Sequence, residues 1–360
     1  MITTLLAFVF VLGLLVFVHE LGHFIAAKKS GIRVETFSLG FPPKLIGKKY
    51  GETEYQIGVI PLGGYVKMMG EYEFDDDYVP KSGDFTAASI WKRYIVIAAG
   101  PIMNFITAIL LFFIIYWASG IPEPVPGTIG ANSIMPGGPA DEAKMNPGSR
   151  ILSIDGIEFT DQAEVVEYIH GRPDIALTFA WQDGDSVITR EITPQANTVK
   201  DSLGNETVVG QIGVGIGSAF EYKPTGPIRA LTEGINATVY LCEQMLYYLY
   251  KFVTFQISIK NFGGPIMIAE QAGRAAQQGF LALLGLAAFL SVNLALLNIL
   301  PIPVLDGGHL VFLTIEAIKR RPVSLKGRLI AQQIGMAVLL LFMVAVTYND
   351  ILRVVGGIFN

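Results

Sequence analysis

His19, Glu20 and His23 form an HExxH motif close to the start of the chain. Residues four apart lie on the same face of an α-helix, so a helix here would present both imidazoles in one direction. Two histidines placed in this way are typical zinc ligands, and the glutamate between them can act as a general base toward water. The spacing therefore predicts half of a hydrolytic zinc centre.

The motif lies in a strongly apolar segment. Residues 2–18 carry no ionisable side chain, and apolar residues resume at Phe24, so the helix can span a hydrocarbon core of ~30 Å. HExxH also occurs by chance in soluble helices, but an acidic residue at mid-membrane costs roughly 2.5 kcal/mol or more. This position favours a metal site. A cleaved signal peptide is not expected, because a basic leader is lacking and the motif would occupy the cleavage region.

A catalytic zinc usually takes three protein ligands, so one more must come from elsewhere in the chain. Asp306 is the leading candidate because it follows an apolar segment that ends at Pro301 and Pro303. Prolines break a helix, and irregular backbone at membrane depth is tolerated where it lines a cavity. His309 is the competing candidate, although it could instead orient a ligand. Cys242 is the single cysteine, which excludes an intrachain disulfide.

The composition bounds the class of protein. Of 360 residues, 51% are hydrophobic and 16% are charged, which indicates a membrane protein with a soluble portion. The net charge of −5 does not suggest a nucleic-acid partner.

Residues 137–156 resemble the start of a PDZ domain. They contain Gly138-Pro139-Ala140 and a glycine-bounded strand pattern, with Ser149 where the PDZ pattern usually has aspartate. An amphipathic helix over 162–170 and two alternating strands follow. PDZ domains bind peptide ends by strand addition, but the ligand of this one is not indicated. His170 is expected to be a surface or helix-capping histidine.

These patterns predict a multi-pass α-helical membrane protein with four transmembrane helices, a small membrane-associated β region and one inserted PDZ-like α+β domain. The lipid bilayer is thus one expected partner. Along the chain we expect transmembrane helix 1 (1–27), a β region (28–93), helix 2 (94–118), the PDZ-like domain (119–222), an amphipathic segment with a Gly-Gly-Pro turn (223–278), helix 3 with the Asp306 motif (279–309), a loop (310–328), helix 4 (329–348) and a tail (349–360).

Two clusters of basic residues predict the topology, because Lys and Arg gather on the cytosolic side of spans. One cluster lies between helices 1 and 2, and the other between helices 3 and 4. Both the HExxH end of helix 1 and the Asp306 end of helix 3 should therefore face the cytosol, with the termini and the PDZ-like domain on the other side. Asn104, inside helix 2, could serve helix packing or help to hold the site.

The β region contains a strand over 65–69 preceded by Gly63-Gly64, which is a turn or bulge signal. This strand could belong to a plain solvent-side sheet. We favour a second interpretation, in which its open edge pairs with an extended peptide, because a protease needs its substrate extended.

The motifs HELGHF, GGYVKM, GPxxNF, GGPI and NxLPIPxLDGGH together resemble the site-2 protease family of intramembrane zinc metalloproteases, and most closely its bacterial RseP branch. The resemblance covers nearly the whole chain. It implies a Zn²⁺ cofactor held by His19, His23 and Asp306, with Glu20 as the catalytic base. It also implies that substrate is bound by Gly63, Gly64, Tyr65, Val66, Lys67, Met68, Asn293 and Asn298.

The family's role implies regulated intramembrane proteolysis in the bacterial inner membrane. The implied substrates are single-pass membrane proteins that another protease has already trimmed, such as anti-sigma factors in a stress response, and signal-peptide remnants. The well-known RseP-type members carry two PDZ domains, whereas this chain has room for one. One alternative is a catalytically silent PDZ membrane scaffold. Another is a metal transporter, which should show inverted repeats that we do not find.

Overall fold

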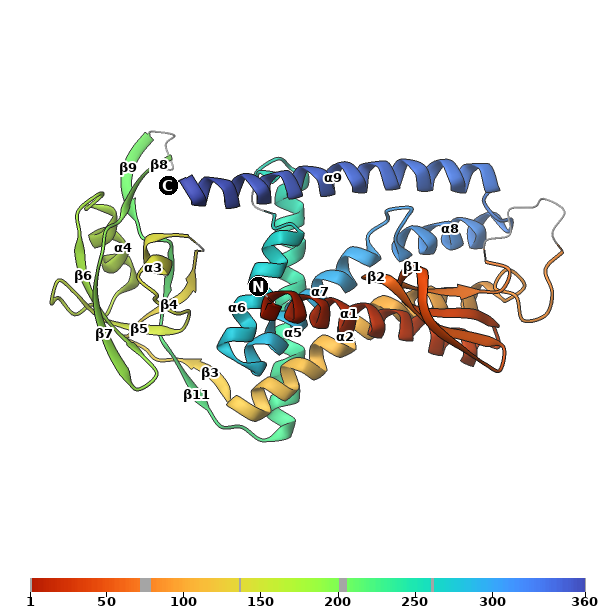
Figure 1. Ribbon diagram of the computed structural model, residues 1–360, viewed down its shortest axis with the longest axis horizontal. Helices are drawn as coiled ribbons and strands as arrows, with labels where there is room; N and C mark the ends of the chain where they lie inside the picture. The colour runs from red at the N-terminus through yellow and green to blue at the C-terminus, as the bar shows by residue number, and fades with distance from the viewer. Residues whose placement is uncertain (1, 72–78, 136, 201–205, 260–261, 360) are drawn as a thin grey trace. The chain divides into compact units, whose positions relative to one another are not determined.

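The computed structural model describes residues 2–71, 79–135, 137–200, 206–259 and 262–359. The chain divides into two compact units (Figure 1). The first combines Met1–Ala118 with Gly226–Asn360, and the second is Ser119–Thr225. Part of the predicted β region, residues 72–78, lies outside the described residues.

Among the described residues, four helices are long and apolar enough to cross a membrane, as predicted. They are α1 (Ile2–Lys29), α2 (Ile90–Ser119), α7 (Phe280–Ile299) and α9 (Leu325–Phe359). The fourth helix starts four residues before the predicted boundary at 329, because Lys326 and Arg328 are good helix formers and extend its first turns. Helix α2 runs without interruption through Pro101, although proline usually breaks or kinks a helix.

Helix α7 ends at Ile299, where Pro301 and Pro303 break the chain, and α8 (Asp306–Lys319) begins directly at Asp306. Gly307 and Gly308 pack so closely on the backbone of residues 299–303 that a Cβ at either position would overlap it. The tight turn therefore depends on these glycines and places Asp306 at the start of a new helix.

Helix α5 (Pro227–Val253) is amphipathic and crosses the other helices in Figure 1, while α6 (Pro265–Gln278) packs against α1 and α7. Small residues allow this packing, since Ala272, Ala287 and Ala288 are fully buried in one apolar cluster with Val11 and Leu15 of α1. This cluster holds the HExxH helix in place.

The strands β1 (Val34–Tyr50) and β2 (Thr53–Met68) fold back on themselves as a small sheet. Residues 34–39 pair with 64–68 on one side and with 54–57 on the other. Gly63-Gly64, a turn or bulge signal in the sequence, lies inside β2 beside an irregularity in the register, where Leu39 pairs with Gly64 on one side and with Ile57 on the other. Residues 64–68 consequently form one edge of this sheet.

The second unit contains a five-stranded antiparallel sheet in the order β10-β4-β5-β6-β7, packed on α4 (Gln162–His170). The sheet strands are β4 (Ile129–Ile134), β5 (Ser149–Ile154), β6 (Leu177–Asp183), β7 (Ser186–Ile192) and β10 (Val214–Gly217). A short helix α3 (Pro139–Glu142) and two ribbons, β3 (Ile121–Pro124) with β11 (Phe220–Lys223) and β8 (Gln195–Lys200) with β9 (Glu206–Gln211), complete the unit. Its core is built around Phe179, Trp181 and Val165, all fully buried.

Candidate metal centre

His19 and His23 of α1 and Asp306 of α8 come together at one point. The two Nε2 atoms lie 3.2 Å apart, and Asp306 Oδ2 lies 3.2 Å from His19 Nε2 and 3.4 Å from His23 Nε2. Three ligands at tetrahedral corners around zinc, each at ~2.0–2.1 Å, are about 3.3 Å from one another. The donor set and its spacing therefore fit a zinc ion.

Two further observations agree with a metal at this point. The Nδ1 atom of His23 lies 2.8 Å from the carbonyl oxygen of Val96, to which it can donate its proton. This hydrogen bond leaves Nε2 free to bind a metal. Asp306 Oδ2 is buried and makes no hydrogen bond to any described residue. A bound cation would supply the partner that a buried polar atom needs.

Asn104 of α2 contacts the other imidazole. Its side-chain Nδ2 is placed 3.2 Å from His19 Nδ1, while its Oδ1 is buried without a partner among the described residues. The two ends of an amide are assigned from their surroundings. If His19 points Nε2 at the metal, its Nδ1 carries the proton and must face an oxygen, so the amide in the opposite orientation satisfies both groups. Of the two roles left open for Asn104, this contact favours holding the site.

Glycines allow α1 and α2 to meet at the centre. A Cβ at Gly100 would overlap the rings of both His19 and His23, and a Cβ at Gly22 would overlap the Ala99 backbone. The sequence carries a signal for this approach, since a glycine inside an apolar helix often has a packing reason.

Glu20 leaves α1 toward the edge of the small sheet. Its carboxylate accepts a hydrogen bond from the Val66 backbone, and a Cβ at Gly64 would come within 3.0 Å of Glu20 Cγ. The edge formed by residues 64–68 thus lies directly beside the candidate base. This strand contains Tyr65, exposed Lys67 and buried Met68, and Gly63 precedes it.

The remaining predicted residues lie on nearby elements. Asn293 and Asn298 are half-buried on α7, the helix that leads to Asp306. His309 lies one turn after Asp306 on α8. It is not part of the cluster of His19, His23 and Asp306, whose ligand atoms lie within 4.8 Å of one another. It lines a neighbouring cavity instead.

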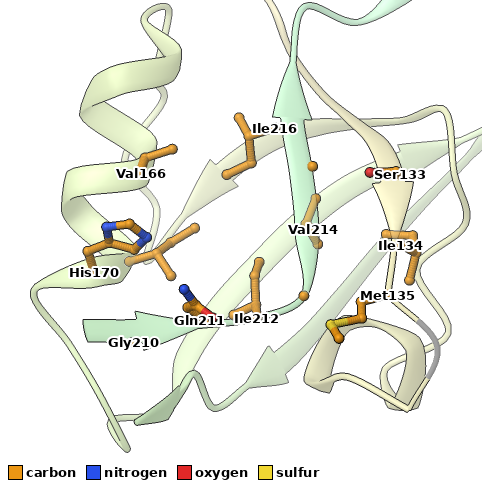
Figure 2. Close-up of a pocket in the computed structure, with 13 residues that line it drawn as sticks. Ser133, Ile134, Met135, Val166, His170, Gly210, Gln211, Ile212, Val214 and Ile216 are labelled. Atoms are coloured by element: carbon orange, nitrogen blue, oxygen red, sulfur yellow. The ribbon is translucent and has the colours of Figure 1, made fainter. Parts of the chain in front are cut away.

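A second concave site lies within the PDZ-like unit. Strand β10 is an edge of its sheet, and the groove of about 390 Å³ between β10 and α4 is lined by Val166, Val214, Ile216 and His170 (Figure 2). His170, which was expected to be a surface or capping residue, lies in the last turn of α4, and its ring forms part of the groove wall (Figure 2).

Comparison with known proteins shows the family to which the chain is similar. The model of peptidase family M50 matches residues 7–342. A protein of Agrobacterium fabrum is 37% identical over 97% of this chain and 96% of its own length. Zinc metalloprotease RasP of Bacillus licheniformis is 32% identical over 97% of this chain and 99% of its own.

The chain is also similar to a second Bacillus protein and, over its inserted unit, to a solved PDZ domain. Regulator of sigma-W protease RasP of Bacillus subtilis is 31% identical, covering 98% of this chain and 99% of its own. A solved PDZ domain of the SdrC-like protein of Listeria monocytogenes covers 26% of this chain and 92% of its own, with 22% identity and a TM-score of 0.21. From the family match and these relatives, the chain belongs to peptidase family M50, the site-2 proteases, and is a multi-pass membrane protein with zinc metalloprotease activity.

Proposed function

We propose that the protein cleaves single-pass membrane proteins within their transmembrane segments, with His19, His23 and Asp306 holding Zn²⁺ and Glu20 as the base. The observation that carries this proposal is the meeting of Asp306 with the HExxH histidines at separations that suit tetrahedral zinc. The helix α1, which carries both histidines, and the helix α7, which leads to Asp306, are apolar and of spanning length, and this supports a centre that a transmembrane substrate can reach.

The residues around the centre support a hydrolytic mechanism. When bound, zinc polarises the scissile carbonyl and acidifies the attacking water. Glu20 takes the proton from that water and later delivers it to the leaving amine nitrogen. Val66 and Asn104 orient the groups involved, the first through the Glu20 carboxylate and the second through His19.

The substrate helix must unwind before cleavage, because a helical peptide bond keeps its carbonyl engaged. Pairing of the unwound segment with the edge at residues 64–68 would offset the lost helical hydrogen bonds. This edge lies beside Glu20, as its Val66 contact shows. Asn293 and Asn298, on the helix that leads to Asp306, would contact the same segment from the other side of the centre.

Substrates of the anti-sigma factor type, trimmed beforehand by another protease, are the proposed class, and signal-peptide remnants are a second. The B. subtilis relative bears the name of a sigma-W regulator. We further propose that the active site faces the cytosolic side of the inner membrane and the PDZ-like unit the periplasmic side. In that unit, the free edge of β10 beside α4 would receive an extended peptide.

The test is a pair of variants assayed on a single-pass reporter substrate in proteoliposomes. Glu20→Gln should retain about one zinc per chain and lose cleavage, because the amide cannot accept a proton. Glu52→Gln is the matched control, since Glu52 lies in the exposed β1–β2 turn and pairs with Lys28. Continued cleavage by Glu20→Gln would refute the proposed base. If Asp306→Asn keeps both its zinc content and its cleavage activity, the assignment of Asp306 as the third ligand is refuted.

A further inference from the structure

The backbone amides along the outer edge of residues 64–68 are engaged by two carboxylates. Met69 N donates to Arg33 O at 2.9 Å, on the side of β1. Successive amides of a strand point to opposite sides, so those of Met68 and Val66 point away from β1. The Val66 backbone bonds to Glu20, and Met68 N donates to Glu71 Oε2 at 3.3 Å.

The Val66 amide serves Glu20, so the Met68 amide is the outward donor that remains for an added strand. In strand addition, the carbonyl oxygens of the incoming peptide accept hydrogen bonds from the outward amides of the edge. The Glu71 carboxylate occupies the place of one such carbonyl at Met68 N. Its 3.3 Å hydrogen bond is longer than the usual value of about 2.9–3.0 Å, so a peptide carbonyl can replace it with better geometry.

The structure also offers the displaced carboxylate another position. Glu71 lines a cavity of about 100 Å³ beside α2, α8 and α9. Two buried donors on the wall of that cavity, Thr86 Oγ1 and Arg328 Nε, have no hydrogen-bond partner among the described residues. Buried donors in proteins are almost always paired, so their position invites an acceptor.

We propose that Glu71 is a displaceable cap on the substrate-binding edge. With the edge unpaired, its carboxylate holds the Met68 amide. When an extended substrate pairs with residues 64–68, the carboxylate turns into the cavity and accepts hydrogen bonds from Thr86 and Arg328. This inference rests on the proposed function, because it takes the strand to be the substrate-binding edge. It makes Glu71 a positioning residue that sets the affinity for substrate and protects an otherwise open strand edge.

The first test is the KM of Glu71→Ala for the reporter substrate in proteoliposomes. Removal of the competing acceptor should lower KM by roughly three- to tenfold, the effect of about one hydrogen bond. Glu71→Gln keeps a weaker, neutral acceptor and should lower KM by less. Glu52→Ala, the control on the same hairpin, should leave KM unchanged. A cap with a purely structural role predicts a lower thermal midpoint with an unchanged or higher KM, and that result would overturn the proposal.

The second test is a double-mutant cycle with Thr86→Val, which removes one of the donors that receive the carboxylate. Thr86→Val alone should raise KM several-fold, and it should have no effect on KM when Glu71 is already alanine. Equal effects in both backgrounds would contradict the coupling. These outcomes are separate from the failure of the proposed function, which would appear as cleavage by Glu20→Gln whatever residue stands at position 71.

Discussion

Arg93 and Glu316 form a buried, two-pronged ion pair between α2 and α8. Arg93 Nη2 lies 2.6 Å from Glu316 Oε1, and Nη1 lies 3.1 Å from Oε2. Arg328 of α9 approaches the same carboxylate at 3.6 Å. Asp306 is the first residue of α8, and Glu316 lies near the end of the same helix. The ion pair therefore helps to position α8, and with it the Asp306 carboxylate, against the two histidines.

Arg93→Ala should therefore destabilise the protein and loosen the metal centre. Loss of one member of a buried pair leaves an uncompensated charge and costs about 3–5 kcal/mol. We expect a lower thermal midpoint and faster loss of zinc to a chelator. Lys44→Ala is the control, since Lys44 pairs with Glu54 at an exposed position, where ion pairs contribute about 0–1 kcal/mol. Equal midpoints for the two variants would contradict this role of Arg93.

Asn104→Ala should weaken zinc binding without removing a ligand. The amide orients the His19 ring. Loss of a side chain that hydrogen-bonds a metal ligand typically lowers metal affinity by roughly 10- to 100-fold. Competition with a calibrated chelator measures the change. Thr107→Ala, one turn along α2, removes only a bond to the Met103 carbonyl and should bind zinc as the parent does.

Gly100→Ala should abolish zinc binding, because its methyl group would occupy the space of both imidazole rings. Alanine is otherwise a better helix former than glycine, so the substitution should not harm α2 itself. Gly13→Ala is the matched control, since a Cβ at Gly13 meets nothing within 4 Å. A zinc content near one per chain in Gly100→Ala would show that the helices meet less closely than described.

The stability of the metal-free protein should depend on the ionisation of Glu71. Burial is the largest cause that raises the pKa of Glu71 from 4.5 to about 7, and the carboxylates of Glu20 and Asp306 add to it, while His23 and the Met68 amide oppose it. Arg93, Arg328 and His309 line the same cavity. A pKa raised by folding means that the folded state binds the proton more tightly, so the stabilisation is complete below about pH 4.5 and is lost as the pH rises through 7.

Between pH 4.5 and a pH above 7, the free energy of unfolding of the parent protein should thus fall by up to about 3 kcal/mol relative to that of Glu71→Gln. Thermal unfolding at a series of pH values, with zinc removed because a bound dication would lower the pKa, measures the difference. Glu52→Gln serves as the control. If the difference in unfolding free energy between the parent and Glu71→Gln is constant across this range, the raised pKa of Glu71 is contradicted.

The sequence alone determined the broad architecture and the chemistry that the chain can carry. Apolar segments of spanning length predict the four helices, because the bilayer leaves few other ways to satisfy their backbones. The four-residue spacing of His19 and His23 needs only a helix to present both rings together. The proline-rich break before Asp306 follows from local backbone chemistry as well. These features are local, so the order of residues is enough to read them.

Only the tertiary structure decided which distant groups meet. The sequence alone does not bring Gly100 against the imidazole rings, Asn104 against His19 or Arg93 against Glu316, because each contact depends on how helices far apart in the chain cross. The same holds for Glu71, because its place in the sequence does not reveal that its carboxylate caps the Met68 amide. Packing of small residues between apolar helices sets these crossings, and their angle and depth are not encoded in any single segment.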